Sequence, residues 1–293
     1  MTSESLPSWK ISQRPEMSRE QFSLWQSMIE TRTGMQFPQQ RKTFMQSSVR
    51  TRMREIQCDS FQRYFEMLQS GPTAEKEWGI LTDRLTVQET HFFRHPESYD
   101  FVQDKVRQRL NADNHEKTIQ AWSVGCSTGE EPYSLAITLD EQIKAANPDN
   151  NRAFGITATD LSLPALNKAQ QGVYQNQAIT RQINSARQQR YFDTYSRTHM
   201  QIKPYLKDRI CFARINVLDL KTVPFNELDI IFCQNLLIYF NPQRRHEIVS
   251  HLADRLTLGG VLVLGLGEVT NYTNPILEKV NSNNVLAYIR HHH

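Results

Sequence analysis

The stretch WSVGCSTGEEPYS, residues 122–134, decides the fold of this 293-residue chain. It reads as a strand that runs into a loop with two glycines and then into a helix. Similar apolar runs are found at residues 119–124, 154–159, 210–215, 228–233 and 261–266. Helical patterns follow several of them, at residues 132–145, 163–170 and 242–256. Strands that alternate with helices predict a parallel, doubly wound α/β sheet.

The glycine loop at Gly125 and Gly129 predicts a ligand site, because ligands of doubly wound folds lie beyond the carboxyl ends of the strands. The loop contains neither the G-x-G-x-x-G fingerprint nor the lysine of a P-loop. Glu130 and Glu131 would also repel a pyrophosphate at the start of the helix. A cofactor with an ammonium and a sulfonium group, S-adenosylmethionine, suits these carboxylates. The alternative is that they only complement the helix dipole.

Polar residues follow two further strands. Asp160 ends the run at 154–159, where a carboxylate can accept hydrogen bonds from ribose hydroxyls. Asn235 and Tyr239 follow the run at 228–233 and should emerge at the same edge of the sheet. Asp160 could instead be a helix cap, and Tyr239 could simply pack with a satisfied hydroxyl.

The chain divides into two predicted domains. Apolar residues at helical spacing predict an all-helical domain over residues 1–90, which begins with a capping box at Ser18 and Gln21. Residues 91–290 form the sheet domain, interrupted by a polar inserted subdomain at about 180–209. Residues 291–293 are a tag remnant.

Composition narrows the class of protein. A hydrophobic content of 39% and a charged content of 22% are ordinary for a globular protein, and the net charge of +3 is too small to imply nucleic acid. No apolar run approaches the ~20 residues of a membrane span. The four cysteines are scattered, so we expect no metal and a cytoplasmic location.

Arg50 and Arg54 are four residues apart in a predicted helix and lie opposite its apolar face, so we expect both on the exposed face. This basic face could bind an acidic partner, or it could simply be solvated.

Together these motifs resemble the chemoreceptor glutamate methyltransferase family, the CheR type. The matching stretches are LTVQETHFFR at 85–94, residues 122–134, Asp160, GVY at 172–174, RYF at 190–192 and IFCQNLLIYF at 231–240. The resemblance implies a Rossmann-like class I methyltransferase sheet with an N-terminal all-helical domain and a small inserted β-subdomain. It also implies methylation of glutamate side chains on chemoreceptors, with S-adenosylmethionine converted to S-adenosylhomocysteine.

The resemblance also implies the site residues. Arg94 and Tyr239 match the positions at the transfer centre, and Gly125 belongs to the glycine loop. The family's cofactor contacts fall on Gln88, Thr90, Arg94, Glu131, Asp160, Asn216, Val217, Gln234 and Asn235. In two places the chain departs from a family member, because Gln88 replaces an asparagine and Gln234 replaces an arginine.

The expected chemistry needs no general base, because a glutamate side chain with a pKa of about 4.3 is already ionised at neutral pH. Arg94 would orient this carboxylate, while His91 and His95 are expected to face solvent. In the family, a basic helix docks on the receptor's helical methylation region, which here implicates Arg50 and Arg54.

Some family members also bind a receptor C-terminal peptide through the inserted subdomain. The segment 193–215 is shorter here and has no glycine, so we expect no such tether. Nothing in the sequence suggests an obligate partner, so we also expect a monomer. Two rival hypotheses are an inactive S-adenosylmethionine-binding module, suggested by Gln234, and a nucleic-acid methyltransferase.

Overall fold

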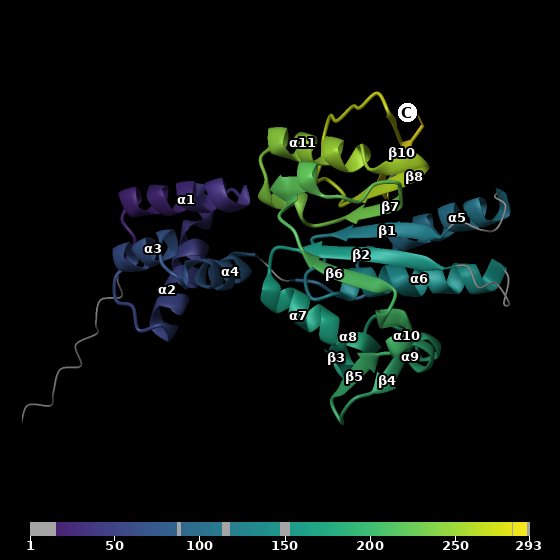
Figure 1. Cartoon of the computed structure of the whole chain (residues 1–293), viewed down its shortest axis with the longest axis horizontal. Coiled ribbons are helices and arrows are strands. Elements are labelled where there is room, and N and C mark those ends of the chain that lie inside the picture. Colours follow the sequence, from purple (N-terminus) through teal and green to yellow (C-terminus); the bar gives the residue numbers. More distant parts are fainter. Residues whose placement is uncertain (1–15, 87–88, 113–117, 147–152, 283, 292–293) are drawn as a thin grey trace, which may run out of the picture.

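The computed structural model describes residues 16–86, 89–112, 118–146, 153–282 and 284–291. Its first part is a layer of helices that lies at the left of Figure 1, beside one end of the large sheet. These helices are α1 (Arg19–Thr33), α2 (Lys42–Glu55), α3 (Phe61–Gln69) and α4 (Ala74–Leu85), with the short helix η1 (Gln39–Arg41) before α2.

Local sequence signals set the limits of α1. The Ser18 hydroxyl accepts a hydrogen bond from the Gln21 amide at 3.1 Å, and the Gln21 side chain accepts one from the Ser18 amide at 3.0 Å. This is the predicted capping box. The helix ends at Gly34, whose φ of 71° favours glycine.

The second part is built around a seven-stranded sheet in the order β6-β2-β1-β7-β8-β10-β9. The strands are β1 (Ile119–Val124), β2 (Phe154–Asp160), β6 (Ile210–Arg214), β7 (Leu228–Cys233), β8 (Leu256–Leu264), β9 (Leu277–Lys279) and β10 (Leu286–Arg290). The first five run parallel, whereas β10 pairs antiparallel with β8 and β9. Because β2 and β7 flank β1 on opposite sides, the chain changes direction across the sheet beside β1, which is where such folds bind ligands.

Helices cover both faces of this sheet. Those of the sheet domain are α5 (Pro96–Ala112), α6 (Glu130–Ala146), α7 (Leu163–Gln171) and α11 (Pro242–Ala253), with the short helices η2 (Val217–Thr222) and η3 (Leu237–Tyr239). Alternate residues of β1 point to different cores. Ile119 and Ala121 pack with α5 and α6, whereas Trp122 and Val124 belong to a core that is continuous with the helical domain.

A small three-stranded antiparallel sheet, in the order β3-β5-β4, lies below the large sheet in Figure 1. It comprises β3 (Val173–Gln175), β4 (Phe192–Thr194) and β5 (His199–Ile202), with the short helices α8 (Asn176–Thr180), α9 (Ser185–Tyr191) and α10 (Pro204–Lys207). The predicted range of about 180–209 contains β4 and β5 but starts after β3. The predicted fold class is therefore confirmed: a doubly wound α/β sheet with a helical N-terminal domain and a small β-subdomain.

Candidate functional site

A cavity opens at the carboxyl edge of the large sheet, beyond β1, β2 and β7. It encloses about 1110 Å³ of empty space, part of it open to solvent, and most of its lining is apolar. The predicted residues that line it are Thr90, Arg94, Gly125, Glu131, Asp160, Asn216, Val217, Gln234, Asn235 and Tyr239. Gln88 lies outside the described residues.

The glycine loop forms the floor of this cavity. Gly125 has a φ of 77°, and its amide donates to the Thr159 carbonyl at 2.8 Å, so the loop turns back onto the end of β2. Gly129, with a φ of 98°, has a second reason to be glycine. A Cβ there would lie 2.8 Å from the Tyr174 hydroxyl oxygen, closer than side chains tolerate.

Asp160 holds two loops together at the end of β2. Its Oδ2 accepts a hydrogen bond from the Ser127 amide, and its Oδ1 accepts one from the Ser162 amide, both at 2.8 Å. A carboxylate has about four lone-pair positions, so each oxygen can accept one more hydrogen bond. Asp160 therefore fixes the backbone at Ser127 and Ser162, and its carboxylate can still accept a hydrogen bond from a hydroxyl group in the cavity.

Of the two neighbouring glutamates, only Glu131 lines the cavity. Glu130 is buried away from it and accepts a hydrogen bond from the Thr128 hydroxyl at 2.6 Å. Burial raises the pKa of Glu131 to about 8, although the hydrogen bond that Ser123 donates at 2.7 Å works in the other direction. The negative charge of Glu268 raises this pKa further, and the positive charge of Arg94 lowers it. A cationic ligand group is what would stabilise an ionised Glu131 here.

Arg94 is held in the cavity wall by a strained backbone. Phe93 and His95, on either side of it, have φ values of 52° and 58°, which only a few per cent of non-glycine residues adopt. Such strain persists only where the surroundings enforce it, and it is concentrated at functional sites. Here the Phe93 amide donates to the Ser134 hydroxyl at 2.9 Å, and the buried Phe93 ring packs edge-on against Tyr99.

The expectation that His91 and His95 face solvent is wrong for both residues. His91 is partly buried and lines the cavity, while His95 is partly buried beside Asn235. The turn around Arg94 places His95 beside Asn235 of the loop after β7. Burial lowers the pKa of His95, and the nearby charge of Arg94 lowers it further, so this ring is neutral at pH 7.

The loop after β7 supplies three predicted residues. Gln234 is buried and its amide nitrogen donates to the Ser98 hydroxyl at 2.8 Å and to the Leu264 carbonyl at 3.2 Å. Its donor group is thus used within the protein. Asn235 has a φ of 59°, and Tyr239, only 8% exposed, closes the cavity beside it.

The helical domain contributes residues that the sequence did not identify. Thr33, the last residue of α1, and Met35, in the turn between α1 and η1, line the cavity. This turn is tied to the sheet domain twice. The Gln36 amide donates to the Tyr239 carbonyl at 2.8 Å, and the Asn216 side chain donates to the Arg32 carbonyl at 3.2 Å. No local pattern predicts these contacts, because they join segments about 200 residues apart.

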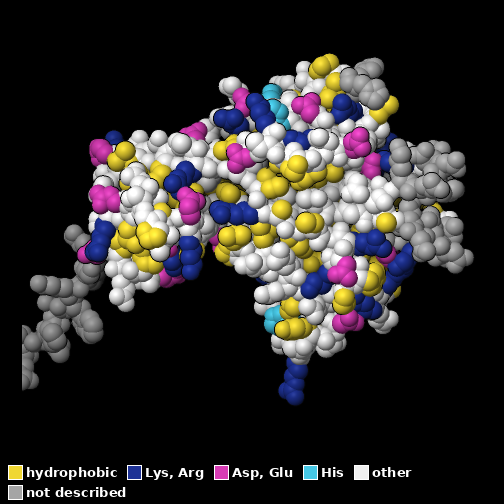
Figure 2. Space-filling view, viewed as in Figure 1, with side chains coloured by type: hydrophobic (Ala, Val, Ile, Leu, Met, Phe, Trp, Pro, Cys, Tyr) yellow, Lys and Arg dark blue, Asp and Glu magenta, His cyan; other side chains and the backbone are white. Residues whose placement is uncertain are grey.

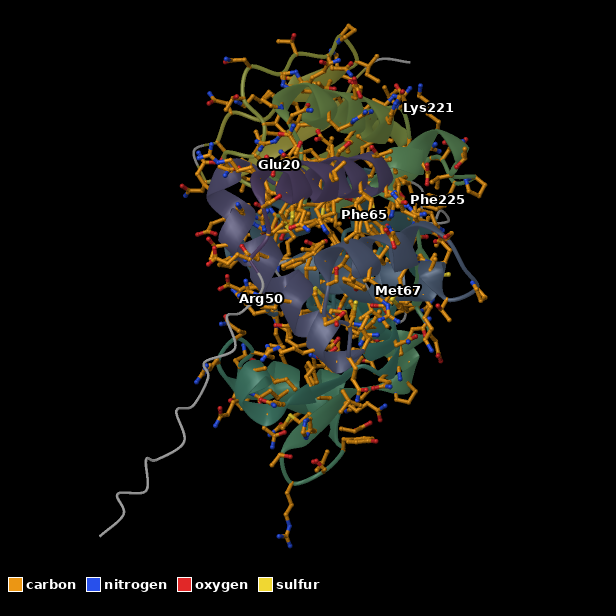
Figure 3. All side chains as sticks on the ribbon, turned by 90° about the vertical axis from the view of Figure 1, so that its left-hand side faces the viewer. Glu20, Arg50, Phe65, Met67, Lys221 and Phe225 are labelled. Atoms are coloured by element: carbon orange, nitrogen blue, oxygen red, sulfur yellow. The ribbon has the colours of Figure 1, made fainter. Side chains whose placement is uncertain are left out.

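The two arginines predicted to dock a partner differ in exposure. Arg54 is exposed at the end of α2, as expected, but Arg50 is partly buried, because its guanidinium reaches the Gln46 amide. Figure 3 looks onto the helical domain and labels Arg50 on α2. Neither residue lines the cavity.

Comparison with known proteins assigns both parts of the chain to the same family. The family model described as CheR methyltransferase, SAM binding domain, matches residues 88–286, and that described as CheR methyltransferase, all-alpha domain, matches residues 20–86.

Curated relatives cover most of the chain. Chemotaxis protein methyltransferase 1 of Pseudomonas aeruginosa is 29% identical over 250 residues, which are 85% of this chain and 90% of that protein. The chemotaxis protein methyltransferase of Salmonella typhimurium is 29% identical over 287 residues, covering 95% and 94%. That of Vibrio parahaemolyticus is 32% identical over 206 residues, covering 70% and 74%.

Proposed function

We propose, on the premise that the chain belongs to the CheR methyltransferase family, that it esterifies glutamate side chains of chemoreceptors with a methyl group from S-adenosylmethionine. Family membership makes it a methyltransferase with an S-adenosylmethionine-binding domain. The glutamate substrate and the role of each site residue are the parts that we add. Chemotaxis methyltransferases among the relatives support a chemoreceptor as the partner.

One observation carries the proposal: the buried carboxyl group of Glu131 faces a largely apolar cavity at the end of β1. Its raised pKa means that ionisation is unfavourable until a cation arrives. The ammonium group of S-adenosylmethionine is such a cation, and Asp160 can accept hydrogen bonds from ribose hydroxyls. The residues therefore fit this cofactor, which supplies a methyl group activated on a sulfonium sulfur. Among the described residues, no group of His, Cys, Asp or Glu could hold a metal ion, and the proposal includes none.

The other residues of the cavity would serve the glutamate substrate. A glutamate carboxylate is ionised at neutral pH, so the protein has no proton to remove. Arg94 can hold this carboxylate through charge-assisted hydrogen bonds and orient it. Tyr239 and the apolar lining exclude water, which strengthens the electrostatic interactions in the site.

The proposal extends to docking and organisation. Arg54, with Arg50 beside it on α2, contacts acidic side chains of the receptor's cytoplasmic helical region. The chain acts in the cytoplasm as a monomer and without a C-terminal peptide tether. The domain boundary lies near residue 90, which the limits of the two family models support. In the described part of the chain, no helix has the length and apolar character needed to cross a membrane.

Transfer of radiolabelled methyl groups to receptor-containing membranes tests the proposal. Wild type should give label that mild base releases, as expected for a glutamate ester. Arg94→Ala should reduce the rate about 100-fold, because the carboxylate is no longer oriented. Arg107→Ala is the matched control, since Arg107 is an exposed residue of α5 outside the cavity and should leave the rate unchanged.

Two outcomes would overturn the proposal. Binding of S-adenosylmethionine without transfer would indicate the inactive binding module. Label on RNA or DNA instead of the receptor would indicate a nucleic-acid methyltransferase. Figure 2 gives that second alternative no support on the face it displays, where basic and acidic side chains are intermixed.

A further inference from the structure

The loop that carries Asn235 and Tyr239 has little regular structure of its own. Asn235 adopts a left-handed conformation, and residues Leu237–Tyr239 form a single 3-10 turn. Such a loop depends on neighbouring groups to fix its backbone amides and carbonyls. Those neighbours come from the segment after β8 and from α11.

Glu268, in the turn after β8, provides the amide side of this support. Its side chain is turned back toward the loop, and the residue is only 2% exposed. Its Oε2 accepts a hydrogen bond from the Gly265 amide at 2.9 Å, and its Oε1 accepts one from the Ile238 amide at 3.3 Å. The Asn235 and Leu237 amides also act on this carboxylate. The salt bridges found among the described residues do not include it, so backbone amides are its stabilising partners.

Arg245 of α11 supports the carbonyl side of the same loop. Its Nε donates to the Phe240 carbonyl at 2.8 Å, and its Nη2 reaches the Ile238 carbonyl at 3.5 Å. Its Nη1 donates to the backbone carbonyl of Glu268 at 2.7 Å. The Arg245 guanidinium thus links Phe240, at the end of the loop, to the backbone of Glu268, whose carboxylate binds the amides earlier in the same loop.

The charge of Glu268 also acts on the cavity. Its carboxylate accepts a hydrogen bond from the amide of Gly265, which directly follows Leu264, the partner of Cys233 at the end of β7. From there its charge raises the pKa of the buried Cys233 thiol and of Glu131. The other groups that act on Glu131 are the Ser123 hydroxyl and the Arg94 guanidinium. Burial raises the pKa of Glu268 itself, and the backbone amides from which it accepts hydrogen bonds lower it. In its ionised form this second carboxylate makes this end of the cavity more attractive to a cation than Glu131 alone would.

We propose that Glu268 is a positioning residue of the methyl-transfer site, which fixes the Asn235–Tyr239 loop through its backbone amides and adds negative charge behind Glu131. This inference rests on the proposed function, because the roles of Asn235 and Tyr239 belong to it. Glu268 does not line the cavity, so it would act through the loop and through its charge.

Glu268→Gln tests the inference, with Glu278→Gln on the exposed surface of β9 as the control for loss of one negative charge. Glutamine keeps the size of the side chain but loses the charge, and its amide nitrogen cannot accept from the loop. Above pH 8, where Glu131 is ionised in both proteins, the affinity for S-adenosylmethionine should fall about tenfold from the lost charge. The kcat for receptor methylation should fall about 100-fold from the displaced loop. Glu278→Gln should match wild type in both.

The pH dependence of cofactor binding separates this role from a purely structural one. Binding to the wild-type protein should weaken below the pKa of Glu131. In Glu268→Gln this onset should move to lower pH, because the charge that raises the pKa is gone. A lower melting temperature with an unchanged kcat and an unchanged onset would overturn the proposal.

A second variant covers the case in which Glu268→Gln does not fold. Glu268→Asp keeps the charge but shortens the side chain, so it should lower kcat while retaining the wild-type pH onset. If both variants fail to fold, Glu268 is a structural residue and the proposal is wrong. Cofactor binding is measured without receptor. Failure of wild type to methylate the receptor would therefore count against the proposed function and leave the comparison of affinities intact.

Discussion

Replacement of Glu131 by glutamine should abolish a proton release that accompanies cofactor binding to the wild-type protein. The pKa of about 8 follows from burial of the carboxyl group, with the charge of Glu268 adding to it and Ser123 and Arg94 opposing it. At pH 7 about nine in ten molecules of the free protein then carry a proton on Glu131. An ammonium group placed beside the carboxyl favours its ionised form, so binding should release close to one proton.

Linkage gives the size of the effect. Below pH 8 the affinity for S-adenosylmethionine should weaken about tenfold for each unit by which the pH falls, and above it the affinity should level off. The stability of the free protein changes in the opposite direction. The folded pKa of Glu131 lies above the unfolded value of about 4.3, so the folded state binds more protons between these values. The contribution of Glu131 to the free energy of unfolding is therefore lost as the pH rises from about 4.3 to about 8. The stability of Glu131→Gln should not show this decrease, because glutamine does not titrate.

Isothermal titration calorimetry in buffers with different ionisation enthalpies counts the released protons directly. Wild type and Glu278→Gln should each release close to one proton at pH 7, and Glu131→Gln should release none and bind more weakly. The reasoning would be refuted if wild type released no proton at pH 7, or if Glu131→Gln released as many.

Two further predictions concern other parts of the molecule. Gly129→Ala should destabilise the protein by about 1–3 kcal/mol from backbone strain, and by more where the new Cβ meets the Tyr174 hydroxyl. Gly71→Ala is the control in chemical denaturation, because Gly71 also has a positive φ but has open space around it. An equal loss of unfolding free energy in both variants would show that the contact with Tyr174 adds nothing. Arg54→Glu should raise the KM for receptor several-fold without changing the affinity for S-adenosylmethionine, since Arg54 lies outside the cavity. Methylation kinetics check this against Arg107→Glu, and an equal effect of both would indicate general charge repulsion instead of docking.

The sequence predicted the parts of the fold that local patterns encode. Strand β1 and strand β7 were predicted with the observed limits, and the glycine loop between β1 and α6 lies at the cavity. Strands β9 and β10 were missed. Strand β9 is three residues long, and β10 is a five-residue strand, LAYIR, without a helix to mark it. Strand β8 begins five residues earlier than predicted, because Gly259 and Gly260 interrupt its apolar pattern.

The residues of the candidate site that belong to a sequence motif were predictable, whereas those placed by contacts between distant segments were not. All the described residues expected around the cofactor line one cavity, although their roles stay predictions. The burial of Arg50 and the inward position of His91 were not predicted, because both depend on tertiary contacts. Glu268 gave no signal in the sequence, since its partners are backbone amides, one of Gly265 in its own turn and others of a loop about 30 residues earlier.

The turn between α1 and η1 makes the cofactor cavity a joint property of the two domains. Thr33 and Met35 form part of its wall, and the Gln36 amide holds the carbonyl of Tyr239. An exchange of helical domains between relatives, made to redirect receptor choice, would replace this wall together with α2, the helix that we propose docks on the receptor. A chimera designed to change only the receptor would therefore have to keep residues 33–36 with the sheet domain. A change of helical domain is therefore expected to alter the affinity for the cofactor together with the choice of receptor, unless residues 33–36 are kept with the sheet domain.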